Sequence, residues 1–125
     1  MSLERNKQTV VDFFERTFNG KDPEGAAAAH LGDSYVQHNP LAADGVDGFL
    51  AFAQASRRRA PELRIEIKRV IAEGDHVVLH TRFITPGAAD RSIMDIFRLE
   101  QGKIVEHWDV IQPVPETAAN TNTMF

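Results

Sequence analysis

The sequence contains no cysteine among its 125 residues. That absence excludes disulfide bridges, thiolate nucleophiles and cysteine-ligated zinc sites, although it identifies no compartment. The sequence also lacks a long apolar run and an excess of basic residues, since its net charge is -4. We therefore expect neither membrane nor nucleic acid as a partner. The charged N-terminus does not resemble a signal peptide, so we expect a soluble, cytoplasmic protein.

The length predicts a single domain, residues 1–125, in which residues 113–125 form a C-terminal tail. Hydrophobic residues make up 42% of the chain, which is ordinary for a globular protein. A domain of this size buries enough surface to fold without covalent staples.

The first half of the chain has the apolar spacing of helices. Residues 3–18 and 22–30 predict two helices, and a third starts at Asp44 or Asp47 and runs to about Arg58. The intervening residues 34–41 predict an extended segment or a loop. The basic cluster at the end of the third helix complements the helix dipole.

The second half alternates apolar and polar residues, the period of half-buried strands. Four strands are expected, at residues 63–73, 76–85, 91–100 and 103–112. Helices followed by a run of strands indicate an α+β fold with the helices on one face of an antiparallel sheet. A long amphipathic sheet with about three helices should curl over them into a cone with an internal pocket.

Three ionisable groups interrupt the otherwise apolar last two strands: Asp95, His107 and Asp109. If Glu100–Gly102 forms a three-residue loop with glycine in the left-handed conformation, Asp95 pairs with His107 and Ile93 with Asp109. Cross-strand partners share a face, so all three ionisable groups would then gather on one side of the sheet.

A two-residue loop at Gln101–Gly102 is the alternative. It would place Asp95 on the same face as Trp108 and move Asp109 to the other side. We favour the three-residue loop, because glycine at the third loop position is its usual mark.

The opposite face of this hairpin is also largely apolar. It carries Met94, Ile96, Ile104, Trp108 and Val110. A single-layer sheet should not be apolar on both sides in water, so we expect a homodimer built through the sheet.

Several segments resemble the SnoaL-like polyketide cyclases of the nuclear transport factor two-like superfold. They are residues 35–40, 95–98 and 102–110, while residues 112–116 and 122–125 resemble a subgroup of SnoaL-like aldol-condensation proteins. The resemblance implies a cone-shaped fold over essentially the whole chain. It also implies ring closure by intramolecular aldol condensation without metal or cofactor, and a tail that folds over the pocket or the partner.

The same resemblance assigns site residues. It puts the acidic residue of the pocket at Asp109, a second polar pocket position at Asp95 and polar groups at the mouth at His38 and Asn39. Such chemistry needs a base beside a carbonyl, donors to the enolate oxygen and an acid for the new alkoxide. Apolar walls would raise the pKa of an aspartate and make it a stronger base at neutral pH.

His80 and Arg82 lie two apart in a strand and so share a face, and they are possible enolate donors if that face is the inner one. The candidate catalytic residues are Asp109, Asp95, His80 and His38. The candidate residues for binding a small hydrophobic carbonyl substrate are Asn39, His107, Arg82, Trp108, Phe97 and Phe14.

Plainer interpretations stay open. Asp95 could pair with Arg82 or Arg98, and Trp108 could belong to the core or an interface. A zinc site from His38, His80 and His107 with an aspartate lacks any close ligand spacing, so we expect no metal. The alternative functions are a dimeric module that binds a small molecule without turnover, and an isomerase or dehydratase of the same superfold.

Overall fold

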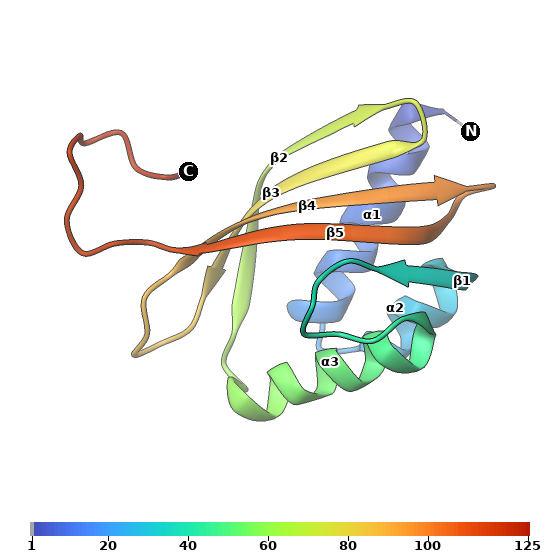
Figure 1. Ribbon diagram of the computed structural model, residues 1–125, viewed down its shortest axis with the longest axis horizontal. Coiled ribbons are helices and arrows are strands. Elements are labelled where there is room, and N and C mark those ends of the chain that lie inside the picture. The colour runs from blue at the N-terminus through green and yellow to red at the C-terminus, as the bar shows by residue number, and fades with distance from the viewer. Residues whose placement is uncertain (1) are drawn as a thin grey trace.

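Three helices pack against one curved sheet of five strands in the computed structural model, which describes residues 2–125. Figure 1 shows the sheet curling over α1, with α3 running from the side of β1 to the start of β2. The elements are α1 Leu3–Phe18, α2 Pro23–His30, β1 Leu31–Gln37, α3 Gly45–Arg59, β2 Arg64–Glu73, β3 His76–Ile84, β4 Arg91–Glu100 and β5 Lys103–Pro113.

The strands lie in the order β1-β5-β4-β3-β2. β1 runs parallel to β5, and the other neighbours are antiparallel. The expected α+β cone is confirmed, with three helices at the expected places. The segment at residues 34–41, expected to be extended or a loop, contributes the end of β1 and the turn that follows.

The first two helices begin where side chains satisfy their free backbone N–H groups. The Ser2 hydroxyl accepts a hydrogen bond from the backbone N–H of Arg5, and the Asp22 carboxylate accepts one from Gly25. Pro23 occupies the first turn of α2, where its missing N–H costs nothing. These caps determine where the two N-terminal helices begin.

The core lies between α1 and the concave face of the sheet. Phe13, Phe14 and Phe97 are buried and pack edge-to-face, with Phe13 and Phe97 ring centroids 6.1 Å apart. In β3 the buried positions alternate, so Val77 and Leu79 face the helices. One face of the sheet therefore packs on α1 and forms the core.

The β4–β5 connection is the two-residue loop considered as the alternative, followed by a bulge that was not predicted. Gln101 and Gly102 have φ angles of 50° and 78°, and Glu100 pairs with Lys103, so the loop is a two-residue type I′ turn. A β-bulge then follows, because Leu99 pairs with Ile104 whereas Arg98 pairs with Glu106.

Val105 is the extra residue of this bulge, and it shifts the register of the rest of the hairpin. Asp95 therefore pairs with Asp109, and Phe97 pairs with His107. The expected pairing of Asp95 with His107 is wrong, and so is the three-residue loop. The expected gathering of Asp95, His107 and Asp109 on one face is nevertheless correct, because turn and bulge together restore the parity.

Leu79→Ala should lower the free energy of unfolding by about 2–4 kcal/mol, because it leaves a cavity at a fully buried position of β3. Ile71, which is 57% exposed, supplies the control, and Ile71→Ala should cost less than about 1 kcal/mol. Urea unfolding followed by circular dichroism measures both. Equal costs at the two positions would contradict the assignment of the concave face as the core.

Candidate active site

A cavity of about 450 Å³ lies between the concave face of the sheet and the helices. Its walls are mainly aromatic and aliphatic. Both its volume and its lining are typical of a site that binds a small molecule. The polar residues at its inner end come from β1, the turn after it, β4 and β5, and are Tyr35, Gln37, Asn39, Asp95, His107 and Asp109. Three adjacent strands thus deliver a polar cluster into an apolar hollow.

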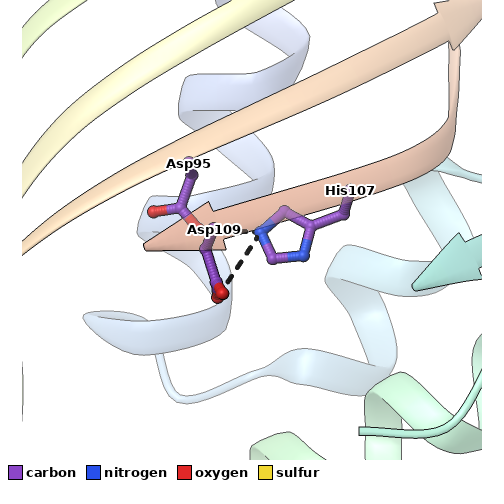
Figure 2. A group of neighbouring side chains, drawn as sticks. All are labelled: Asp95, His107 and Asp109. Carbon is purple, nitrogen blue, oxygen red and sulfur yellow. Dashed lines mark hydrogen bonds and ion pairs between the residues drawn. The ribbon is translucent and has the colours of Figure 1, made fainter. Parts of the chain in front are cut away.

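Asp95 and His107 form the buried centre of this cluster (Figure 2). The Oδ1 atom of Asp95 lies 2.7 Å from Nε2 of His107, and the two residues are only 2% and 7% exposed. The Oδ2 atom of Asp95 is buried and finds no hydrogen-bond partner within residues 2–125. An unpaired buried carboxylate oxygen is costly, so this position is adapted to something other than stability.

Gln37 fixes the tautomer of His107. The backbone N–H of Asn39 donates to Oε1 of Gln37 at 2.9 Å, which sets the orientation of the side-chain amide. Nδ1 of His107 lies 2.8 Å from the same oxygen, so Nδ1 carries a hydrogen and donates it. Nε2 therefore faces Asp95, and the pair can hold one shared proton between these two atoms.

Asp109 stands directly across from Asp95 on the neighbouring strand. Its Oδ2 accepts a hydrogen bond from the Asn39 side-chain amide at 2.9 Å and lies 4.0 Å from Nε2 of His107. Figure 2 shows both carboxyl groups converging on the imidazole ring. Two carboxylates and one imidazole at this spacing provide separate proton donors and acceptors.

Burial dominates the electrostatics of the cluster. It raises the pKa of Asp95 above the ordinary value of an aspartate, an effect that the His107 hydrogen bond opposes and the nearby Asp109 charge reinforces. Burial, together with the charge of Asp95, also raises the pKa of Tyr35. Tyr35 is thus a neutral hydroxyl at neutral pH and can donate a hydrogen bond into the cavity.

A family model described as the SnoaL-like domain matches residues 10–107. This chain belongs to that family. The matched residues include the second half of α1, the other two helices and most of the sheet, and the cone is that of the nuclear transport factor two-like fold. No curated protein sequence gives a significant match to the chain.

Solved structures resemble this SnoaL-like domain over most of its length. TsrD from Streptomyces laurentii is 22% identical with a TM-score of 0.76, and the match covers 89% of this chain and 90% of that one. A candidate SnoaL-like polyketide cyclase from Jannaschia is 20% identical with a TM-score of 0.75, covering 86% and 85%. A candidate polyketide cyclase from Bacillus cereus is 22% identical with a TM-score of 0.74, covering 86% and 74%. At these identities the likeness supports the fold alone.

The domain brings together six of the residues expected at the site from the sequence. Those that line the cavity are Asp109, Asp95, Asn39, His107, Phe97 and Phe14. Asp95 pairs with neither of the arginines considered for it, because Arg82 binds Asp90 and Arg98 binds Glu106.

His80 and Arg82 lie outside the cavity, which corrects their expected role as enolate donors. Their face of β3 is the convex one, because the alternate residues Leu79 and Thr81 fill the core. The last residue of the chain meets them there: the Phe125 ring stacks on His80 at 5.9 Å, and the Arg82 guanidinium lies 4.8 Å from the ring centroid. The tail thus folds onto the outer face of its own sheet.

His38 and Trp108 are likewise absent from the cavity lining. The His38 ring stacks on Trp108 with centroids 4.8 Å apart, and its Nε2 lies 2.7 Å from a carboxylate oxygen of Glu106. Glu106 also accepts a hydrogen bond from Arg98, so these residues form a network on the convex face. The expected roles of His38 in catalysis and Trp108 in substrate binding are therefore corrected.

Two polar residues of the cluster, Tyr35 and Gln37, were not predicted as site residues. They alternate with Asn39 at a spacing of two, which places all three side chains on one side of an extended chain. That alternation could have identified Tyr35 and Gln37 as site residues. It was missed because residues 34–41 were predicted to be either an extended segment or a loop, and a loop has no fixed alternation of faces. Arg59 and Arg91 also line the cavity without having been predicted.

Within residues 2–125, one group of side chains could hold a metal ion: Asp95, His107 and Asp109. One ligand atom from each lies within 4.8 Å of the others. This set has one nitrogen and two oxygen donors, and it differs from the three-histidine set considered from the sequence.

Among the described helices, none is both long and apolar enough to cross a membrane.

Asp95→Asn should stabilise the protein at neutral pH. Because burial raises the pKa of Asp95, the folded chain binds this proton more tightly than the unfolded chain does. The resulting stability is fully present below the unfolded-state pKa, near pH 4, and is lost as pH rises through the raised folded-state value. The variant cannot ionise at this position. Its free energy of unfolding should therefore exceed that of the wild type by an amount that grows from about pH 4 to about pH 8.

Urea midpoints across this pH range measure the effect. Asp33→Asn is the control, because Asp33 is an exposed residue of β1 outside the acidic cluster, and its variant should show no such gain over the wild type. An Asp95→Asn variant less stable than the wild type at pH 8 would contradict burial as the dominant influence on Asp95.

Proposed function

We propose that this SnoaL-like domain is a cofactor-independent enzyme that transfers protons on a small hydrophobic carbonyl compound, with aldol-type ring closure as the favoured overall reaction. The observation that carries the proposal is the placing of two aspartates and one histidine, hydrogen-bonded and largely buried, at the inner end of an apolar cavity. Membership of the family supports the cyclase-type reaction.

Asp109 acts as the base. Its carboxylate lines the cavity and accepts a hydrogen bond from Asn39. Its side chain is 11% exposed, so a substrate can reach it. Asp95 is more deeply buried and already shares its Oδ1 with His107. The division of roles follows from these environments: the accessible carboxylate removes a proton, and the buried one holds a proton with the imidazole.

The reaction then balances within the cluster. Asp109 takes a proton from the carbon next to the carbonyl, and the electron pair moves onto the carbonyl oxygen as an enolate. The neutral Tyr35 hydroxyl and the Asn39 amide can donate to that oxygen. The enolate carbon attacks a second carbonyl of the same molecule, and the new alkoxide takes the proton shared by Asp95 and His107. The proton on Asp109 returns to that pair and closes the cycle.

Exchange of α-hydrogens isolates the first step. Wild-type protein in D₂O should accelerate deuterium uptake by 2-tetralone, a small hydrophobic ketone, as followed by proton NMR. Asp109→Asn should lower the rate by about 100-fold or more, because it removes the base. His80→Gln is the control, since His80 lies on the convex face, and it should retain the wild-type rate.

Two results separate the alternatives. Retention of full exchange by Asp109→Asn would remove Asp109 from the mechanism. Tight binding of 2-tetralone by the wild type without exchange above buffer would favour the non-catalytic binding module. An isomerase or dehydratase would show exchange without ring closure of a 1,5-diketone such as 2-(3-oxobutyl)cyclohexanone.

We further propose that the convex face pairs with a second copy of the chain. Met94, Ile96 and Val110 are 42%, 37% and 72% exposed there and lie side by side on β4 and β5. Such a patch on a sheet is typical of a protein interface.

Val110→Asp should convert the dimer into a monomer, because it buries a charge in that interface. Light scattering after gel filtration should give twice 14.0 kDa for the wild type and 14.0 kDa for the variant. Glu116→Gln, an exposed change in the tail, is the control and should leave the mass unchanged. A wild-type mass of 14.0 kDa at micromolar concentration would refute the dimer.

A further inference from the structure

Two arginines line the cavity away from the acidic cluster. Arg59 is the last residue of α3 and is exposed, whereas Arg91 is the first residue of β4 and is half-buried. Nη2 of Arg59 donates to the Ser56 hydroxyl at 3.4 Å, and the Arg91 guanidinium lies 5.4 Å from the Phe83 ring centroid. Within residues 2–125 neither forms an ion pair with a carboxylate.

Within the described chain, both guanidinium groups therefore line the cavity without a carboxylate partner. Arg82 and Arg98, on the convex face, each bind a carboxylate at 2.6–2.8 Å. Arg91 instead has its pKa lowered, first by burial and then by the positive charge of Arg59. Two uncompensated guanidinium groups beside an apolar hollow are a recognised arrangement for binding an oxyanion, because each presents a planar fork of donors.

The two ends of the cavity are joined by one strand. Arg91 and Asp95 are four residues apart on β4, with Ile93 between them on the same concave face. At about 3.3 Å per residue their Cα atoms are separated by about 13 Å. The lining between the ends is apolar, so a ligand that reached both would have a hydrophobic body with a different polar group at each end.

We infer that the substrate is an anion: a hydrophobic compound with a terminal oxyanion, carboxylate or phosphate, that binds Arg59 and Arg91 while its carbonyl lies against Asp109. The carbonyl end of this inference rests on the proposed function. The anionic end rests only on the arginines and the cavity. The negative charge of the aspartates would repel the oxyanion from the inner end, so the ligand enters in one orientation.

Binding of matched probes tests the anionic end without turnover. The probes are 8-phenyloctanoate, 8-phenyloctyl phosphate and uncharged 8-phenyloctan-1-ol, which have the same hydrophobic body. Isothermal titration calorimetry on the wild type should give at least about tenfold tighter binding for one of the two anions than for the alcohol. Whichever anion binds tighter identifies the terminal group.

Arg91→Met and Arg59→Met should each lower the preference for the anion by about tenfold while leaving the affinity for the alcohol within about twofold. Arg91→Lys retains the charge and should keep part of the preference. Arg58→Met is the matched control, because Arg58 precedes Arg59 in the same helix turn, is exposed and does not line the cavity. It should bind all three probes as the wild type does.

Equal affinity of the wild type for the alcohol and both anions would overturn the inference. So would an undiminished preference in both methionine variants whose far-ultraviolet circular dichroism matches the wild type. Failure here with normal deuterium exchange on 2-tetralone removes only the anionic substrate class. Loss of exchange with an intact anion preference removes the proposed reaction and leaves the anion site standing.

Discussion

The extra residue in β5, Val105, is the constraint on which the site depends. A tight type I′ turn at Gln101–Gly102 would by itself pair Asp95 with Trp108 and direct Asp109 to the convex side. The bulge adds one residue to β5 and reverses the facing of everything beyond it. The indole then goes to the outer network, whereas His107 and Asp109 go to the cavity, which Asp95 already faces. One unpaired residue thereby decides whether Asp95 is alone on this hairpin or part of an acid–base cluster.

The parallel strand β1 supplies the second constraint. It brings Gln37 beside His107 and fixes which imidazole nitrogen carries a hydrogen, through the backbone N–H of Asn39. The same turn holds Asp109 through the Asn39 side chain. Each functional group in the cluster is therefore oriented by a neighbour that is itself fixed by the backbone, which is what precise proton transfer requires.

The sequence was sufficient to predict the features that depend only on the spacing of apolar and polar residues. The helices, the four antiparallel strands and the shared face of Asp95 and Asp109 all follow from residue spacing. The shared face was predicted correctly although the loop was not, because the turn and the bulge together leave the same residues of β5 facing the helices. The facing of β3 was left open, although its alternation already favours one face: Val77, Leu79 and Phe83 alternate with His76, His80 and Arg82, and the apolar set packs on the helices. Arg59 was hidden, because the helix dipole already explained a basic residue there.

The distance between the arginines and the aspartates has a chemical reason of its own. An arginine beside a catalytic carboxylate would favour its ionised form and so weaken it as a base. The Cα atoms of Arg91 and Asp95 are about 13 Å apart along β4. Neither arginine is among the charges that shift the pKa of Asp95. A cavity that must attract an anion and also retain a basic carboxylate has to keep these charges at opposite ends. The apolar length between them is then the feature that would select the substrate's size.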